Sequence, residues 1–228
     1  MINETPLLTI NTRITRPDPA KIAALRGAQT SHLVDSMDGR GALDWTIKPL
    51  DPANAKFCGP AITAHAWPAD NLAVYGAIEQ ARAGDVIMVA SDGYKATAVV
   101  GDLVVGTMRN KGVIGLVLDG MARDRAGIVA TGVPVFAAGI TPNSPAKTGP
   151  GTVNLPITIG GVPVSPGDVI VGDEDGVVVI PQAQLDAVIA ALKIVLVAEA
   201  AGEARVKSGA IMSDAAGKLL ASDRVKRL

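Results

Sequence analysis

One acidic residue and an arginine–aspartate pair lie at the two ends of an apolar stretch of the chain. Asp102 stands near the start of VVGDLVVGTMRNKGVIGLVLDGMARD, and Arg123 and Asp124 stand at its end. Carboxylate oxygens suit Mg²⁺ or Mn²⁺, and Mg²⁺ takes only one or two protein carboxylates because it keeps several waters. The planar guanidinium group of arginine suits a keto carboxylate or an enolate. Together the three side chains could bind a divalent cation and an anionic substrate.

The same residue types also have an ordinary structural explanation. Asp102 would then cap a helix, and Arg123 and Asp124 would form an ion pair in a loop. Aspartate and arginine are common at the ends of helices and strands, so spacing alone favours this structural explanation. The choice between the two depends on the elements that position these side chains.

The sequence around these residues predicts alternating strands and helices. Short continuous apolar runs over 86–90 and 113–119 are typical of buried parallel strands. A helix from about 101 to 111 connects them and ends at Gly112, which acts as a glycine cap. After the second strand, a short helix leads to a third strand over 133–138. This order is typical of a parallel sheet with crossover helices.

The predicted sheet brings the acidic residue and the arginine–aspartate pair to the same edge. Asp102 begins one crossover helix, and Arg123 and Asp124 follow the next strand. In such sheets, ligands bind beyond the carboxyl ends of the strands and beside helix N-termini. The twenty intervening residues are apolar because they form a helix and a strand of the core.

The rest of the chain indicates one domain. We expect an extended arm over 1–17 and a single domain over 18–228, which begins with a helix capped by Asp18. A strand is predicted at CGPAITAHAW, and a helix begins near Asp70 and Asn71. The apolar side of that helix is expected to consist of Leu72, Tyr75, Ala77 and Ile78.

The second half of the domain changes character. Its β-branched residues, Gly, Pro and Asp predict short strands joined by tight turns at 160–161, 165–168 and 173–176. A long helix follows from about 182 to 207. The apolar face of this helix is expected to consist of Leu185, Val188, Ile189, Leu192, Val195 and Leu196.

The overall composition limits the classes of protein to which the chain can belong. Hydrophobic residues make up 48% of the 228 residues and aromatic residues only 3%, so the core is built from Ala, Val, Ile and Leu. The 21 Lys and Arg residues nearly balance the 22 Asp and Glu residues. This balance does not suggest a nucleic-acid or anionic-membrane surface, although balanced charge excludes neither, and we expect neither partner. The single cysteine, Cys58, excludes an intramolecular disulfide and is typical of a reducing compartment. No apolar run reaches membrane-spanning length, so we expect a soluble cytoplasmic protein.

Three further residues are candidates for ligand binding. Lys147, in TPNSPAKTGPG, could bind a substrate carboxylate or form a Schiff base, although such a lysine is more often solvated. Asn71 could present a polar group to a ligand, although Asp70 and Asn71 also suit a helix N-cap. Glu199, taken alone, belongs to the solvated face of the long helix.

Three segments of the chain carry a resemblance to a known family. GDLVVGTMRNKGVIGLVLDGMARD, GVPVFAAGITP and VSPGDVIVGDEDGVVVIP resemble the RraA-like family over about residues 20 to 210. That family includes the 4-hydroxy-4-methyl-2-oxoglutarate / 4-carboxy-4-hydroxy-2-oxoadipate aldolases, which also decarboxylate oxaloacetate, and the protein regulator of ribonuclease E. The resemblance implies an α/β fold of the β/β/α swivelling type, a homotrimer or homohexamer, and active sites between subunits.

The resemblance also implies which residues hold a divalent metal, Mg²⁺ or Mn²⁺. Asp124 would ligate it directly, and Asp102 would hold it through water. Glu199 of a neighbouring subunit would also act through water, with Glu203 as the alternative register.

The substrate contacts follow from the same resemblance. Arg123 would contact the keto or enolate oxygen of pyruvate, and the backbone amides near Leu103 and Val104 would take its carboxylate. Asn71 would contact the substrate from a segment that reads PADN where the family has PGDN, and Lys147 would meet the distal part of the substrate.

These implications predict a class II pyruvate aldolase. It would cleave 2-keto diacids of the 4-hydroxy-4-methyl-2-oxoglutarate type and decarboxylate oxaloacetate through a pyruvate enolate. The alternative is a non-catalytic regulator of ribonuclease activity with the same fold, against which the acid at position 102 argues. A methyltransferase has no support in the sequence, because no S-adenosylmethionine-like glycine motif precedes a strand.

Overall fold

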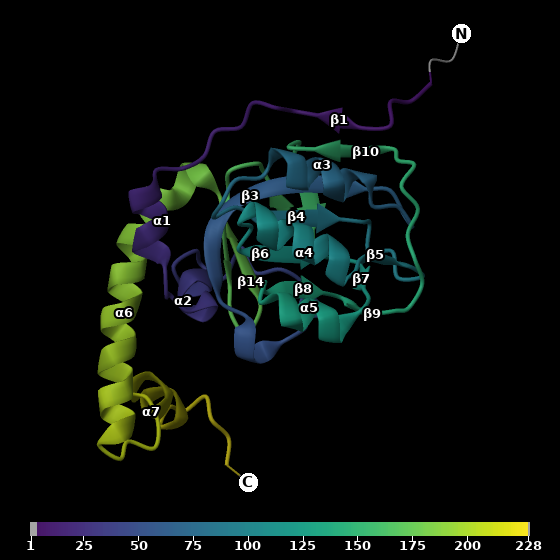
Figure 1. Ribbon diagram of the computed structural model, residues 1–228. Coiled ribbons are helices and arrows are strands. Elements are labelled where there is room, and N and C mark those ends of the chain that lie inside the picture. The colour runs from purple at the N-terminus through teal and green to yellow at the C-terminus, as the bar shows by residue number, and fades with distance from the viewer. Residues whose placement is uncertain (1–3, 228) are drawn as a thin grey trace.

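A mixed β-sheet forms the centre of the protein in the computed structural model, which describes residues 4–227 (Figure 1). Its middle consists of four parallel strands: β3 (Phe57–Ala66), β4 (Val86–Ala90), β6 (Gly115–Leu118) and β8 (Val135–Ala137). Five more strands extend it: β1 (Thr9–Ile10), β10 (Gly151–Val153), β2 (Lys48–Pro49), β13 (Val169–Gly172) and β14 (Val177–Ile180). The order is β1-β10-β3-β4-β6-β8-β2, and β13 pairs with both β3 and β14.

Helices cover the sheet in two groups. One face carries three crossover helices: α3 (Leu72–Gln80), α4 (Asp102–Lys111) and α5 (Arg125–Thr131) (Figure 1). Near β13 and β14, three other helices pack together: α1 (Pro19–Leu25), α2 (Thr30–Asp35) and α6 (Leu185–Lys207). A last helix, α7 (Asp214–Leu220), follows α6.

Small elements complete the fold. A three-stranded parallel sheet consists of β5 (Ala98–Val100), β7 (Met121–Ala122) and β9 (Gly139–Ile140). A hairpin consists of β11 (Ile157–Ile159) and β12 (Val162–Val164). Two 3-10 turns are η1 (Pro52–Asn54) and η2 (Gln182–Gln184).

The predicted alternation of strands and helices is confirmed. The runs at 86–90 and 113–119 contain the buried parallel strands β4 and β6, and α4 connects them and ends at Gly112 in the left-handed conformation. The Asp18 carboxylate caps α1 as expected, because it accepts a hydrogen bond from the Ala20 amide at 2.8 Å. Residues 4–17 of the predicted arm add β1 to the sheet, parallel to β10, and residues 1–3 of it lie outside the described residues.

The predicted apolar side of α3 is wrong in part. The buried residues of this helix are small, Ala73, Val74, Gly76 and Ala77. A Cβ on Gly76 would lie 2.9 Å from Val153, so only small residues allow α3 to approach β10 this closely. Tyr75 is consequently turned outward, with 37% of its surface exposed.

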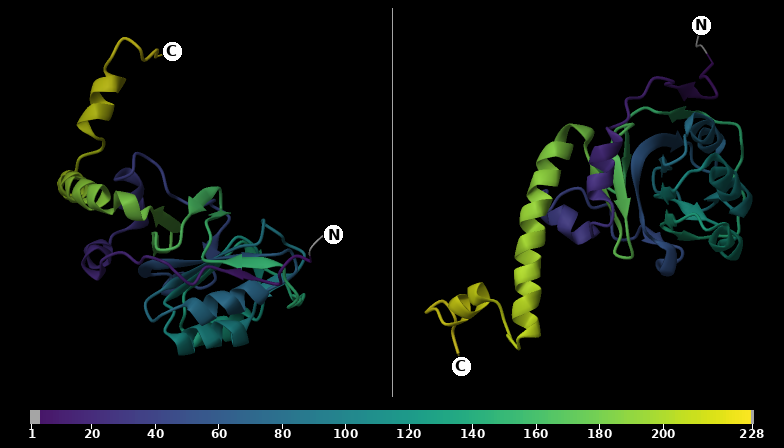
Figure 2. Two further views of the ribbon diagram at one scale, coloured as in Figure 1. Left: turned by 90° about the horizontal axis from the view of Figure 1, so that it is seen from above. Right: turned by 60° about the vertical axis from the view of Figure 1, so that its left-hand side comes forward.

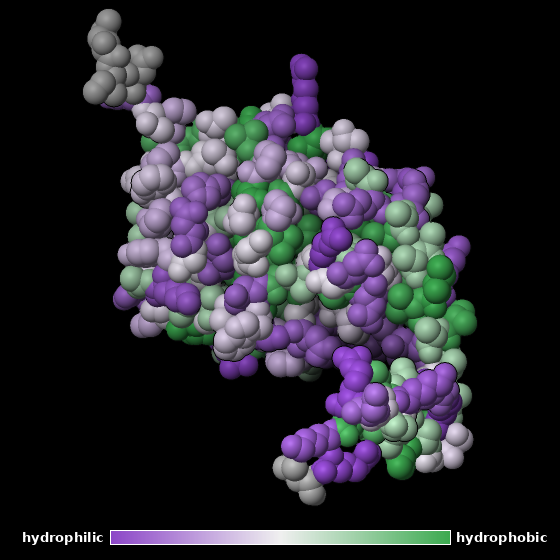
Figure 3. Space-filling model, turned by 180° about the vertical axis from the view of Figure 1, so that it is seen from behind, coloured by the Kyte–Doolittle hydropathy of each residue, from purple (hydrophilic) through white to green (hydrophobic). Residues whose placement is uncertain are grey.

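The long helix α6 is packed along only its first half. Leu185, Val188 and Leu192 are buried as predicted, whereas Leu196 is exposed. From residue 193 to 207 no side chain of α6 is buried, and this part of the helix projects from the body together with α7 (Figure 2). Exposed apolar side chains gather there: Ile194, Leu196, Val197, Val206, Ile211, Met212, Leu219 and Leu220 (Figure 3). No helix among residues 4–227 is both long and apolar enough to cross a membrane.

Candidate active site

The start of α4 and the turn after β7 meet at one edge of the fold. The small β5–β7–β9 sheet holds them together, because β5 leads into α4 and β7 leads into the turn that starts α5. The Arg123 amide donates to the Val100 carbonyl at 3.0 Å, which continues the pairing of β5 with β7. Residues separated by twenty positions in the sequence are therefore neighbours, as the sequence predicted.

A pocket of about 210 Å³ opens at this edge. Its lining includes every predicted site residue except Glu199: Asn71, Asp102, Leu103, Val104, Arg123, Asp124 and Lys147. Tyr75, Val99, Gly101, Ser144 and Pro145 complete the wall. This small size suits a compact ligand, since it lies below the usual range of drug-sized pockets.

Asp124 occupies an unusual backbone conformation in the wall of the pocket. Its φ of 56° and ψ of 42° are left-handed, a region that aspartate tolerates better than most residues other than glycine. This conformation turns the carboxylate towards the start of α4, because a Cβ on Gly101 would lie 2.5 Å from Asp124 Oδ2. Such strained positions are concentrated at functional sites.

Arg123 forms the ion pair that the structural explanation required. Its Nε lies 3.2 Å from Asp124 Oδ2, and its Nη1 donates to the Ser144 hydroxyl. Both partners of the ion pair remain partly exposed to the pocket. The pair therefore holds the guanidinium group in the pocket wall and leaves it within reach of a ligand.

Asp102 begins α4 and faces the start of α5. Its Oδ1 accepts a hydrogen bond from the Leu103 amide at 2.7 Å, and Gly127 is the residue of α5 that allows its carboxylate to lie so close. The N-cap residue of α4, Gly101, provides no side-chain cap. A ligand carboxylate that bound the Leu103 amide would replace Asp102 as its acceptor.

The carboxylates of Asp102 and Asp124 fit a hard divalent cation. Both line the pocket, both offer only oxygen, and no histidine or cysteine lines it. Among residues 4–227, no group of three or more His, Cys, Asp or Glu side chains could hold a metal ion. A site with two carboxylates, in which water or substrate fills the other coordination positions of the cation, matches the ligands that Mg²⁺ prefers better than those that zinc prefers.

Asn71 presents a buried polar atom without a partner. The residue is 2% exposed, and its Nδ2 donates to the Val99 carbonyl at 3.0 Å. Its Oδ1 has no hydrogen-bond partner within the described chain. Asn71 stands at the N-cap position of α3 but does not cap it, since Asp70 Oδ1 accepts from the Leu72 amide instead. A buried acceptor without a donor is costly, so it favours a ligand that donates to it.

Asp70 fastens the loop that carries Lys147. This buried carboxylate accepts hydrogen bonds from the backbone amides of Thr148 and Gly149, at 2.5 and 3.0 Å. On the other side of Lys147, the Ala146 amide donates to the Ala69 carbonyl at 2.7 Å. Burial alone raises the pKa of Asp70, but the hydrogen bonds from Leu72, Thr148 and Gly149 together lower it.

Asp70→Asn should lower the free energy of unfolding by about 1.5–3 kcal/mol at neutral pH, the usual value for hydrogen bonds to a charged group. Because the pKa of Asp70 is lowered on folding, this stabilisation is present above the ordinary pKa of aspartate. It is lost as the pH falls through the lower pKa of the folded state. Urea unfolding at pH 7 and at pH 3 should show a difference from wild type that shrinks at the lower pH. Asp35→Asn, at an exposed position, is the control, and an equal effect of both changes at pH 7 would contradict the prediction.

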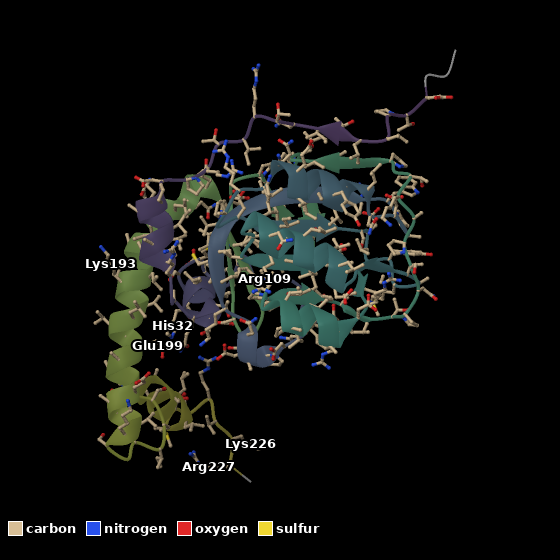
Figure 4. All side chains as sticks on the ribbon, viewed as in Figure 1. His32, Arg109, Lys193, Glu199, Lys226 and Arg227 are labelled. Atoms are coloured by element: carbon tan, nitrogen blue, oxygen red, sulfur yellow. The ribbon has the colours of Figure 1, made fainter. Side chains whose placement is uncertain are left out.

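Glu199 lies away from this pocket within its own chain. It is on the exposed part of α6, on the side of the molecule that carries His32 of α2 (Figure 4). The pocket opens at the other edge of the sheet, where β5, β7 and β9 lie. Its predicted action on a neighbouring subunit stays a prediction.

Sequence reasoning missed Tyr75 and Ser144 as pocket residues. Tyr75 follows Asn71 by four positions, so the two share a face of α3, and this spacing was the available signal. Ser144 lies in an irregular loop, where no periodicity indicates which way a side chain points.

Comparisons with known proteins agree on one family. A sequence profile of the RraA-like family, described as Aldolase/RraA, matches residues 30–179. A protein of Halalkalibacterium halodurans named "Putative 4-hydroxy-4-methyl-2-oxoglutarate aldolase" is 44% identical over 163 residues, which cover 72% of this chain and 77% of that protein.

Two solved structures also resemble the chain. RraAS2 of Streptomyces coelicolor, described as an unusual member of the RNase ES inhibitor RraA protein family, is 28% identical with a TM-score of 0.74 and covers 83% of this chain and 100% of its own. The RNA-processing inhibitor RraA of Thermus thermophilis is 31% identical with a TM-score of 0.62 and covers 68% of this chain and 93% of its own. These similarities confirm the predicted fold class.

Proposed function

Because the chain belongs to the RraA-like family, we propose that it is a divalent-metal-dependent aldolase of 2-keto diacids. Its substrates are of the 4-hydroxy-4-methyl-2-oxoglutarate type, and it also decarboxylates oxaloacetate. The observation that carries the proposal is the pocket that Asp102 lines together with the ion pair of Arg123 and Asp124. The name of the Halalkalibacterium halodurans relative supports the same activity.

Different residues of the pocket bind different parts of the substrate. The amides of Leu103 and Val104, at the positive end of α4, bind the carboxylate next to the keto group. Asn71, at the start of α3, contacts the substrate through its unpaired Oδ1, and Lys147 contacts the far end. The substrate is thereby held with its keto oxygen next to Arg123.

The chemistry is the cleavage of the bond between C3 and C4. In an aldol substrate the C4 hydroxyl loses its proton to water and becomes a carbonyl, and the bonding electrons form the enolate of pyruvate. In oxaloacetate, CO₂ leaves and the same enolate forms. In both reactions a proton from water then adds to C3 of the enolate and gives pyruvate. Asp124 directly, and Asp102 through water, would hold Mg²⁺ or Mn²⁺, which would supply Lewis-acid stabilisation of the enolate charge. Arg123 donates to the keto oxygen as negative charge develops there, a contact that strengthens in the transition state.

Pyruvate release from 4-hydroxy-4-methyl-2-oxoglutarate and from oxaloacetate tests the proposal. Activity should require Mg²⁺ or Mn²⁺, disappear in EDTA and return when the cation is added in excess, because the pocket offers only oxygen ligands. Incubation with borohydride and substrate is the control for a Schiff base at Lys147. Full activity in EDTA, or inactivation by borohydride, would refute the metal mechanism in favour of a lysine imine.

We also propose that the protein is a homotrimer or homohexamer with active sites between subunits. The projecting part of α6 supports this proposal, because Ile194 and Val197 are 73% and 72% exposed there. Glu199 lies on the same segment, so a neighbour that covered these apolar side chains would also receive its carboxylate.

A regulator of RNA processing is the second candidate function. The similarity to the RraA proteins of Streptomyces coelicolor and Thermus thermophilis favours it. The pyruvate-release assay distinguishes the two functions, since a regulator without catalysis would release pyruvate from either substrate no faster than a protein-free blank at the same cation concentration.

A further inference from the structure

The Lys147 ammonium group lies over the ring of Tyr75. Its Nζ is 6.0 Å from the ring centroid, at the limit of the distance at which an aromatic face attracts a cation. Within residues 4–227, Lys147 forms no ion pair with a carboxylate. The aromatic ring is therefore the group of the described chain that attracts this charge at the pocket wall.

The backbone on both sides of Lys147 is already fixed. Ala146 is hydrogen bonded to Ala69 and Asn71, and Thr148 is hydrogen bonded to the buried Asp70 carboxylate. What remains free is the flexible lysine side chain. A cation that is held in place before binding loses less conformational freedom when a ligand arrives, which raises affinity without a new contact.

Tyr75 is well placed to hold this side chain. It lies one helical turn after Asn71 on the pocket-facing side of α3, and α3 is fixed to β10 by the close contact at Gly76. Asp102 and Asp124 line the pocket where α4 meets α5, since Asp102 lies against Gly127 of α5 and Asp124 is the N-cap residue of α5, and their charges repel a second carboxylate. Tyr75 belongs to α3, which lies on the other side of α4 (Figure 1). The end of the pocket near Tyr75 is consequently where a second carboxylate of a ligand is accepted.

We propose that Tyr75 is a positioning residue that holds Lys147 over the pocket, so that the site selects 2-oxo acids with a carboxylate at their far end. The inference rests on the proposed function, because Lys147 can contact the terminal carboxylate only when the pocket binds the keto acid group of the ligand. Tyr75 acts through Lys147, and its ring face is what matters, so phenylalanine should replace it.

Measurements of ligand binding test this proposal and require no catalytic activity. The two ligands are 2-oxoglutarate and 2-oxopentanoate, which differ only in the terminal carboxylate. Their dissociation constants are measured by calorimetry with Mg²⁺ present, and the ratio of the two constants gives the preference. Wild type should prefer 2-oxoglutarate, and Lys147→Met should remove the preference. Tyr75→Leu should reduce the preference about 3- to 10-fold, as expected for a lost cation–aromatic contact. Tyr75→Phe should keep it within about 2-fold.

Three outcomes would overturn the proposal. They are an unchanged preference in Tyr75→Leu, an equal loss of affinity for both ligands, and a Tyr75→Phe variant as impaired as Tyr75→Leu. The pyruvate-release assay on wild type separates this result from the aldolase proposal. A protein that releases no pyruvate but shows the expected changes in preference refutes the aldolase and supports the role of Tyr75. If wild type releases pyruvate but the Tyr75→Leu variant keeps the wild-type preference, the aldolase is supported and the role of Tyr75 is refuted.

Discussion

Arg123→Lys should lower kcat for cleavage of 4-hydroxy-4-methyl-2-oxoglutarate about 10²–10³-fold, the usual effect of losing one aimed donor to a developing oxyanion. Lysine keeps the charge and most of the apolar stem, so the melting temperature should stay close to that of wild type. It cannot reproduce the planar fork of the guanidinium group, which here reaches Asp124 and Ser144 at once and leaves the group facing the pocket. The measurements are kcat and melting temperature on the same preparation.

A neighbouring arginine supplies the matched control. Arg125 begins α5 and donates from Nε to the Leu50 carbonyl at 2.8 Å, and it does not line the pocket. Arg125→Lys should therefore leave kcat near wild type, whatever it does to stability. If Arg123 were only a structural partner of Asp124, both lysine variants would lower the melting temperature and neither would lower turnover per folded molecule. Near-wild-type turnover in Arg123→Lys would rule out its catalytic role.

Alanine substitutions of the two aspartates of the pocket should have different effects on metal-dependent turnover. Asp124→Ala should abolish metal-dependent turnover, because Asp124 is the proposed direct ligand and its side chain faces the start of α4. Asp102→Ala should weaken metal binding and retain turnover at high cation concentration, since its proposed contact passes through water. Titration of activity with Mg²⁺ separates a shift in the cation requirement from a loss of maximum rate.

The elements that bring the site together could be predicted from sequence because they follow from local rules. Continuous apolar runs of four to seven residues identify buried strands, Gly112 ends α4, and parallel strands place the residues after them at one edge. The position of Asp102 next to the Arg123–Asp124 pair is a consequence of that topology. The left-handed backbone of Asp124 could not be predicted in this way, because a loop conformation depends on tertiary contacts, here with α4.

Other features depend on what packs against a residue, and periodicity does not contain that information. Tyr75 was assigned to the apolar side of α3, but the close contact at Gly76 turns the helix so that Tyr75 faces the pocket. Leu196 continues the apolar face of α6 in sequence, but the body of the protein ends before it. The same apolar pattern therefore indicates an internal core in the first half of α6 and, as proposed here, an interface in the second half.

Subunits carrying Asp124→Ala and subunits carrying Glu199→Ala should regain activity when they are assembled together. Each variant alone should be impaired, Asp124→Ala completely and Glu199→Ala about 10–100-fold, the usual effect of removing a group that supports a metal site. Glu199 lies across the molecule from the pocket of its own chain, so a shared site is the arrangement in which it can act on that pocket (Figure 4). In a mixed ring, a pocket from a Glu199→Ala subunit meets an intact Glu199 from an Asp124→Ala neighbour.

The expected recovery follows from the geometry of a ring. If each site combines the pocket of one subunit with the glutamate of the next, random assembly of equal amounts makes about a quarter of the sites intact. Co-refolding of the two variants should therefore give about a quarter of wild-type turnover, and co-refolding Asp124→Ala with Arg123→Lys, which affect the same pocket, should give no such recovery. Light scattering on the same samples should show a trimer or hexamer. A monomer with full activity, or a mixture no more active than the average of its parts, would refute the shared site and leave Glu199 as a solvated residue of α6.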